Sequence, residues 1–245
     1  MTSISAAPLA PKSLPLLWGT AALSLGLVWI APSAQALTLN SSSGSWTNTV
    51  GGSNISFPTV GAESQVRWGD PVGSQNSGLG FTGVGSGSIL PGASFLVGTL
   101  RHFNQTIWGG AASGVDLGIN LDFAGLGNQL FNFTLAIDET PNGGTCAYYS
   151  VTPCADKISW LNAQASHSFI SSGTEYTLEL LGFTNAPNGS LVTDLISQEG
   201  GNNAAYLYAR VTEVEQPPED VPEPMGALGL LGAIALGWWR KVSLA

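Results

Sequence analysis

The sequence predicts an all-β protein whose main domain is a two-sheet β-sandwich, of jelly-roll or immunoglobulin-like type, with one apolar helix at each end of the chain. Three observations support this prediction. Short segments alternate apolar and polar residues with a period of two, Gly, Asn, Ser and Pro separate these segments, and the domain lacks a convincing 3.6-residue apolar period. Many short strands parted by turn residues are typical of β-sandwiches.

The N-terminal residues 1–36 are predicted to form a helical secretory signal peptide. A basic residue precedes an apolar run that ends at Pro32 and the small-residue sequence Ala34-Gln35-Ala36. This pattern is typical of a signal-peptidase site and predicts export by the Sec machinery, followed by cleavage before Leu37. The alternative, an uncleaved signal anchor, is disfavoured by Pro32 and by the Ala-x-Ala sequence.

The domain itself is predicted to span residues 37–214, and its clearest strands lie in the middle. Residues 115–123 place Val, Leu, Ile, Leu and Phe at alternate positions, and residues 131–137 repeat the pattern after a Gly-rich turn, so we expect an antiparallel hairpin. Eight further strands are predicted at residues 45–50, 55–60, 65–68, 95–100, 157–161, 167–170, 175–183 and 205–214.

Two other segments of the domain have weaker patterns. Residues 190–197 have the best helical pattern, which amounts to one or two turns. Residues 69–92 are dominated by Ser, Gly, Asn and Pro and fit either a long functional loop or an ordered connection that carries one more edge strand. We favour the ordered connection.

Cys146 and Cys154 are the only cysteines, and they lie eight positions apart. In an exported protein such a pair is predicted to form a disulfide that closes one small loop. A metal site is disfavoured because neither histidine lies at a ligand spacing from the pair, and a redox pair is disfavoured because the C-x-x-C spacing is absent.

The charge balance of the exported part excludes a nucleic-acid partner. Without Lys12, Arg240 and Lys241, four basic residues remain against all sixteen acidic ones, which is a formal charge of −12. Such a surface is soluble and attracts divalent cations.

The C-terminal residues 215–245 combine an acidic spacer with a short apolar segment. Residues 215–224 form a Pro-rich acidic linker that ends in Val221-Pro222-Glu223-Pro224. The fifteen residues 225–239 carry no charge, and Arg240-Lys241 follows as a stop-transfer signal before a short tail. The sequence therefore predicts that residues 225–245 form a transmembrane sorting helix in the inner membrane and a basic tail, with the basic end in the cytoplasm.

This C-terminal arrangement resembles the PEP-CTERM sorting signal of bacteria that produce exopolysaccharide. The order of a VPEP motif, a short apolar helix, a basic pair and a chain end carries the resemblance. The resemblance implies that a membrane-embedded exosortase processes the chain near the motif. An ordinary single-span anchor is the alternative, and the apolar segment alone does not separate the two.

A second resemblance covers nearly the whole domain. Residues 95–107 match the F-x-x-G-x-x-x-H-x-N-x-x-I block of the choice-of-anchor K and THxN groups of surface-sorted proteins. Arg101 stands where the THxN form has Thr, so choice-of-anchor K fits better. The resemblance implies a β-rich surface domain and supplies no active site. His102 and Asn104 share one face near a strand end, where we expect side chain to backbone hydrogen bonds, with a ligand or catalytic role as the alternative.

Oxygen-bearing side chains on either side of the cysteine loop suggest a calcium site, although we expect no obligatory cofactor. Asp138, Glu139, Asn142 and Asp156 could converge as hard oxygen ligands, but their spacing matches no EF-hand or RTX pattern. Among the tryptophans, Trp160 is predicted to lie in the core. Trp108, beside two glycines, is the best candidate for an exposed ring that stacks on a sugar.

The sequence therefore predicts a non-enzymatic, exported bacterial protein that is anchored in the inner membrane during transit. An exosortase then leaves it at the cell surface or in the extracellular matrix, with a structural or adhesive role in the polysaccharide layer. A carbohydrate-binding module is the first alternative, and exposed tryptophans in a groove would favour it. A calcium-dependent hydrolase is the second, and two carboxylates about 5 to 10 Å apart in a cleft would favour it.

Overall fold

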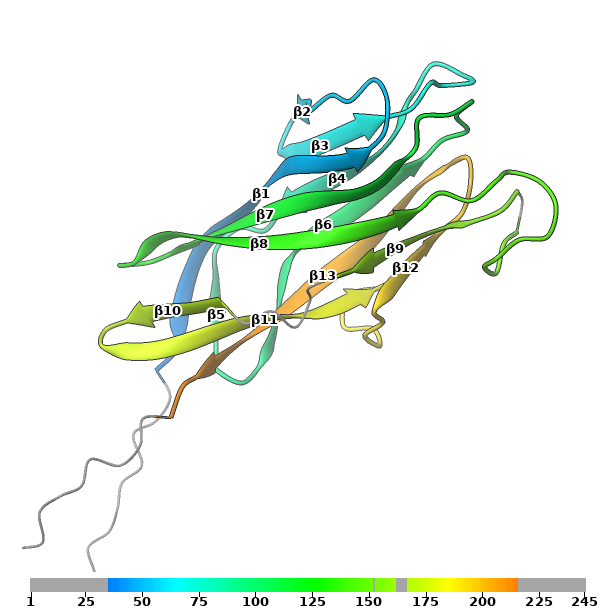
Figure 1. Cartoon of the computed structure of the whole chain (residues 1–245). Helices are drawn as coiled ribbons and strands as arrows, with labels where there is room; N and C mark the ends of the chain where they lie inside the picture. The colour runs from blue at the N-terminus through cyan, green and yellow to red at the C-terminus, as the bar shows by residue number, and fades with distance from the viewer. Residues whose placement is uncertain (1–34, 152, 162–166, 216–245) are drawn as a thin grey trace, which may run out of the picture. The chain divides into compact units, whose positions relative to one another are not determined.

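The computed structural model describes residues 35–215, except residue 152 and residues 162–166. Over this range the chain forms two antiparallel sheets (Figure 1). The predicted signal helix, the linker beyond residue 215 and the predicted transmembrane helix lie outside the described residues. In the part of the chain that is described, no helix is long and apolar enough to cross a membrane.

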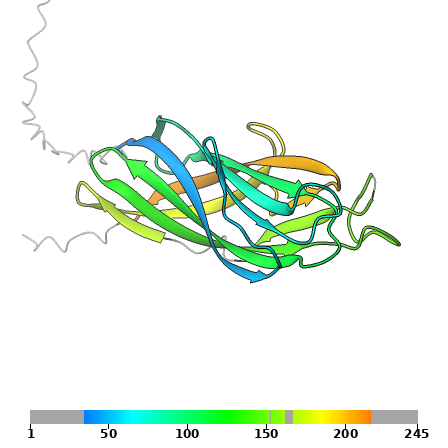
Figure 2. The ribbon, with the colours of Figure 1, turned by 90° about the horizontal axis from the view of Figure 1, so that it is seen from above.

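The six-stranded sheet has the order β12-β9-β8-β7-β1-β5, and the seven-stranded sheet has the order β10-β11-β13-β6-β4-β3-β2. The strands of the first sheet are β1 (Leu37–Gly51), β5 (Gly87–Ile89), β7 (Ala112–Phe123), β8 (Gly127–Asp138), β9 (Asp156–Trp160) and β12 (Asp194–Ser197). Those of the second are β2 (Thr59–Val60), β3 (Glu63–Trp68), β4 (Ser77–Gly83), β6 (Ser94–Asn104), β10 (His167–Ser171), β11 (Thr174–Thr184) and β13 (Gly201–Glu213). Figure 2 shows the two layers from above.

One hydrophobic core fills the space between the two sheets. The alternate residues of β7 from Val115 to Phe123 are buried, as are those of β8 from Phe131 to Ile137. The two strands pair as an antiparallel hairpin with Leu117 opposite Phe133, so their apolar side chains share one face. The predicted hairpin is thereby confirmed, and its inward face meets buried residues of the second sheet in one cluster.

Several predicted element bounds were wrong. β1 begins at Leu37 rather than residue 45, because its Ser-rich first half pairs with β5 and β7. The predicted strand 55–60 shrinks to the two residues of β2. The last part of the segment with the weak helical pattern is strand β12, which pairs with β9. Residues 69–92 are ordered as expected, but they hold the central strand β4 as well as the edge strand β5.

Glycine allows the two sheets to approach each other closely near β1. A Cβ atom at Gly83 of β4 would lie 1.8 Å from the carbonyl oxygen of Ser42. The Ser42 hydroxyl donates to the carbonyl of Val97 in β6, and it accepts from the amide of Val84. A side chain at position 83 would therefore break a contact between the sheets.

The domain begins and ends at the same end of the sandwich. Leu37 at the start of β1 pairs with Ile89, and the amide of Gly92, three residues later, donates to the carbonyl of Val211 near the end of β13. β6 starts beside this end, with Ser94 opposite Arg210, and runs the length of the sheet. We call the opposite end, where β6 finishes, the tip (Figure 1).

Candidate functional site

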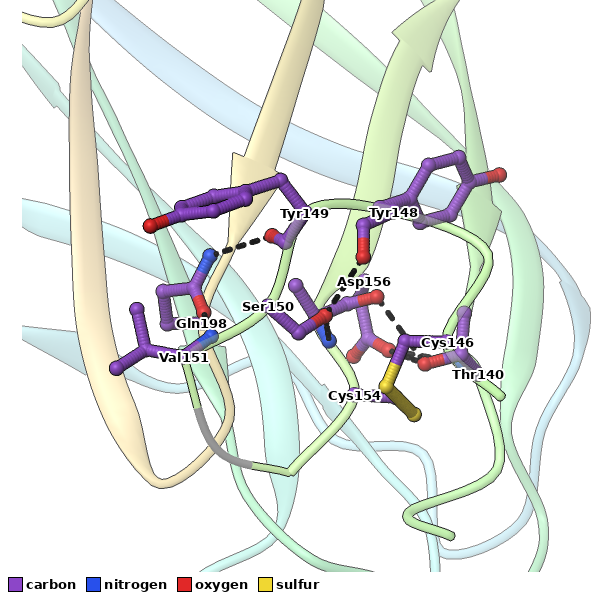
Figure 3. Close-up of a disulfide and its surroundings, with 10 residues drawn as sticks. Thr140, Cys146, Tyr148, Tyr149, Ser150, Val151, Cys154, Asp156 and Gln198 are labelled. Carbon is purple, nitrogen blue, oxygen red and sulfur yellow. Dashed lines mark hydrogen bonds between the residues drawn. A yellow bond between two sulfur atoms is a disulfide. The ribbon is translucent and has the colours of Figure 1, made fainter. Parts of the chain in front are cut away.

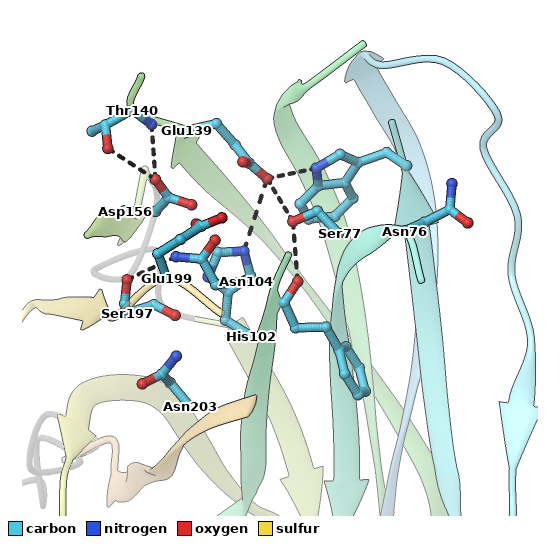
Figure 4. Close-up of polar contacts among 12 residues, drawn as sticks. Asn76, Ser77, His102, Asn104, Glu139, Thr140, Asp156, Ser197, Glu199 and Asn203 are labelled. Atoms are coloured by element: carbon cyan, nitrogen blue, oxygen red, sulfur yellow. Dashed lines mark hydrogen bonds and ion pairs between the residues drawn. The ribbon is translucent and has the colours of Figure 1, made fainter. Parts of the chain in front are cut away.

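Six polar residues meet at the tip, and we call them the tip cluster. They come from the ends of three strands and from the segments after two strands: His102 and Asn104 of β6, Asp156 of β9, Ser197 of β12, Glu139 after β8 and Glu199 after β12 (Figure 4). β6 belongs to one sheet, and β8, β9 and β12 belong to the other. The cluster therefore bridges the two layers of the sandwich.

The polar side chains point into the tip because they lie on the inward faces of these strands. Glu139 continues the buried row that ends with Ile137, and His102 continues the row that contains Leu100. Asp156 precedes Ile158 in the same phase. Because side chains alternate between faces along a strand, each of these polar residues occupies the next inward position of an apolar row.

Glu139 accepts hydrogen bonds from both the indole and the hydroxyl beside it. Its Oε1 lies 2.7 Å from Trp68 Nε1 and 2.8 Å from Ser77 Oγ. The same oxygen lies 4.0 Å from His102 Nε2. Burial raises the pKa of the Glu139 carboxyl, and the hydrogen bonds from Ser77 and Trp68 oppose this effect.

Asp156 is only 1% exposed. Its Oδ1 accepts from the amide of Thr140 at 2.8 Å and from the Thr140 hydroxyl at 3.2 Å. A side-chain hydrogen bond between the Asp156 and Glu139 carboxyl groups opposes the rise in the pKa of Glu139. Burial, and after it the negative charge of Glu139, raise the pKa of the Asp156 carboxyl to about 8. Two carboxyl groups that repel each other in a dry site favour a neutral form of one of them.

His102 is completely buried and stacks on Trp68 with ring centroids 6.3 Å apart. Burial, and after it the positive charge of Arg67, lower the pKa of the His102 imidazole to about 3. The ring is therefore neutral at ordinary pH, and one nitrogen carries a free lone pair. Neither ring nitrogen has a hydrogen-bond partner within the described part of the chain.

The strand-end hydrogen bonds that we expected are present for Asn104 and not for His102. Asn104 Nδ2 donates to the carbonyl of Ser197 at 2.9 Å and so joins β6 to β12. Its Oδ1 has no partner among the described residues. Among the described residues the side chain of His102 makes no hydrogen bond to the backbone, which corrects the expectation for that residue.

The predicted oxygen-ligand set comes together only in part. Glu139 and Asp156 converge, but Asp138 faces outward and accepts from the hydroxyl of Tyr148. Asn142 donates through Nδ2 to Glu199 Oε1 at 2.9 Å. The sequence analysis missed Glu199, whose negative charge helps to raise the pKa of both Glu139 and Asp156.

A groove of about 420 Å³ opens beside the cluster. Its lining includes Val72, Thr106, Ile107, Trp108, Glu139 and Asn142. Trp108 is 81% exposed, as predicted, and lies on this lining. Trp160, which was predicted to lie in the core, is only partly buried: it packs against the core and stacks on Phe183, with ring centroids 5.1 Å apart.

The predicted disulfide between Cys146 and Cys154 is confirmed (Figure 3). It closes a loop of the tip that leads directly into Asp156. Inside this loop Ser150 Oγ donates to the carbonyl of Tyr148 at 2.9 Å and accepts from the amide of Ala155 at 2.7 Å. The cross-link and these bonds hold the chain that delivers Asp156 to the cluster.

Comparison with known proteins adds nothing to this geometry. No family model matches the chain, and no curated protein matches it.

Proposed function

We propose that this chain is an exported surface or extracellular-matrix protein that an exosortase sorts through its C-terminal tail, with a structural or adhesive role in a polysaccharide layer. The single observation that carries the proposal is the tail itself, with its VPEP motif at residues 221–224, an uncharged segment and the pair Arg240-Lys241. The disulfide supports an oxidising, extracellular location. The jelly-roll or immunoglobulin-like type of the sandwich stays a prediction.

The position of the chain ends within the domain supports a display role. Residue 215, from which the acidic linker departs, follows β13 at the end opposite the tip. An extended linker from that end would attach the domain at its base. The tip cluster and the groove with Trp108 would then face away from the membrane.

Mass spectrometry of the mature protein from the producing cells tests the sorting proposal. Protein recovered from medium and envelope should begin at Leu37 and end near Pro222 to Pro224. A variant with Pro222→Ala and Pro224→Ala should keep the C-terminal segment and accumulate in the inner membrane. Wild-type protein that still ends at Ala245 would contradict the proposal.

Carbohydrate binding is a second candidate function, and the exposure of Trp108 on the groove lining favours it. Aromatic rings stack on the apolar faces of sugars, and the neighbouring Thr106 and Asn142 offer polar groups. In affinity electrophoresis through the producer's polysaccharide, Trp108→Ala should abolish retardation. Tyr149→Ala is the matched control, because Tyr149 is 84% exposed and does not line the groove. Equal retardation of both variants would exclude Trp108 as the platform.

We propose no enzymatic activity. A glycoside hydrolase needs two carboxylates that both reach the substrate. Glu139 lines the groove, but Asp156 is buried and is not among the lining residues. The carboxyl groups of Glu139 and Asp156 lie close together. This arrangement favours joint binding of one ion over an acid and base pair on either side of a sugar.

A further inference from the structure

The tip cluster holds an unusual concentration of buried polar atoms without partners. They are both ring nitrogens of His102, Asn104 Oδ1 and Ser197 Oγ, and none has a hydrogen-bond partner among the described residues. The side chains of these three residues are fully buried. Folded proteins rarely leave buried polar groups unpaired, because their lost hydration is then uncompensated. Such a group of atoms indicates that something binds between them.

The charges of the cluster indicate a cation. Glu139, Asp156 and Glu199 bring three carboxyl groups together, and within the described range no lysine or arginine lies at ion-pair distance from any of them. The arginine ion pairs of the domain involve Glu63 and Glu179 instead. His102 is neutral and does not balance the charge. A divalent cation would neutralise the carboxylates in this largely buried site.

The ligand atoms are close enough for one ion. One ligand atom each from His102, Glu139 and Asp156 lies within 4.8 Å of the other two. In a tetrahedral zinc site with bonds of about 2.0 to 2.2 Å, two ligand atoms lie about 3.3 to 3.6 Å apart. The three groups therefore need to move together by at most about 1.5 Å. The adjoining groove, which Glu139 lines, gives the ion a path from solvent.

We propose that His102, Glu139 and Asp156 bind one divalent transition-metal ion of the zinc class. An imidazole nitrogen with two carboxylates is a set that suits zinc, whereas calcium prefers oxygen ligands alone. Asn104 Oδ1 or a water molecule would complete the coordination. Because His102 belongs to one sheet and the two carboxylates to the other, the ion would tie the layers together at the tip.

This proposal does not depend on how the chain is sorted, and metal binding tests it directly. The full-length chain is purified in mild detergent without an oligohistidine tag, stripped with chelator and titrated with ZnCl₂. We expect one zinc ion per chain by calorimetry. The melting temperature should rise by about 5 to 10 °C when free zinc exceeds the dissociation constant 100-fold.

Two substitutions assign the ligands. Asp156→Asn keeps the shape of the side chain and its contact with Thr140, so the protein should fold and bind zinc about 100-fold more weakly or not at all. His102→Gln should have the same effect on binding. His167→Gln is the matched control for a histidine outside the cluster, and Asp122→Asn is the control for a carboxylate. Both controls should retain the zinc-dependent shift.

Three results would overturn the proposal. One is the absence of both bound zinc and a melting shift in the wild-type chain. Another is an unchanged zinc affinity in Asp156→Asn, which decides the matter even where His102→Gln fails to fold. The third is stabilisation by calcium without stabilisation by zinc, because this would remove the imidazole from the ligand set.

Discussion

The Asp156→Asn substitution should change how the stability of the metal-free protein depends on pH. The pKa of the Asp156 carboxyl is about 8 in the folded chain, compared with about 3.9 for an unfolded aspartate. The folded state therefore binds more protons than the unfolded state between these values. The free energy of unfolding must then fall as pH rises toward 8, and it changes no further above that value.

The magnitude follows from the window between about pH 6.5 and 8, in which Asp156 outweighs His102. The pKa of His102 is lowered to about 3, so His102 makes the protein more stable as pH rises from about 3 through 6.5, and it still adds a few tenths of a kcal/mol between pH 6.5 and 8 while the unfolded histidine loses its proton. Between pH 6.5 and 8 one extra proton on the folded state gives a slope of at most about 1.4 kcal/mol per pH unit. That slope falls to half at about pH 8 and His102 opposes it, so the wild-type protein should lose about 1 kcal/mol over this window. The raised pKa of Glu139 acts in the same direction.

Urea unfolding at pH 6.5 and at pH 8, in the presence of a chelator, measures this loss. Asp156→Asn carries no charge at either pH, so its stability should be nearly flat, and at pH 8 it should exceed that of the wild type. Asp122→Asn, on the polar face of β7, should keep the wild-type slope. The reasoning is refuted by a wild-type protein that becomes more stable across this window, or by a full slope in Asp156→Asn.

Three further substitutions test the packing of the tip and of the core by urea unfolding. Replacing Cys146 and Cys154 by Ser should cost about 2.5 kcal/mol on the chain-entropy relation for this eight-residue separation; no loss would show that the loop is held by other contacts. Trp68→Phe removes the indole donor to Glu139 and should cost about 1 to 3 kcal/mol; an unchanged midpoint would mean that water replaces the donor. Gly83→Ala places a Cβ against a backbone carbonyl of β1 and should cost about 3 kcal/mol; a neutral effect would show that the strands can separate there.

The sequence predicted those strands that can be recognised without their neighbours. β7 alternates apolar and polar residues from Val115 to Phe123 and β8 from Phe131 to Ile137, and this pattern alone identifies the buried face. The first half of β1 has few apolar residues, and β12 has four residues in all, so both depend on strands that are distant in sequence. Propensity did not find them, because pairing rather than local preference makes them strands.

The candidate site was predicted less well than the fold, for a related reason. Asp138 and Glu139 are adjacent in sequence and were expected to act together, but neighbours on a strand face opposite sides. Glu139 points inward and Asp138 outward to Tyr148. Glu199 follows β12, which sequence patterns missed, so its approach to the cluster could not be predicted.

The inward rows of the sandwich end differently at its two ends, and this difference argues for a function at the tip. At the base, Phe123, Phe169 and Tyr176 close the core with stacked rings. At the tip, the inward positions after Leu100 and Ile137 are instead taken by polar residues with unpaired atoms. Apolar residues of similar volume would stabilise such a site more. At the tip, polar residues therefore interrupt the apolar pattern of these rows. Binding explains their presence there better than stability does.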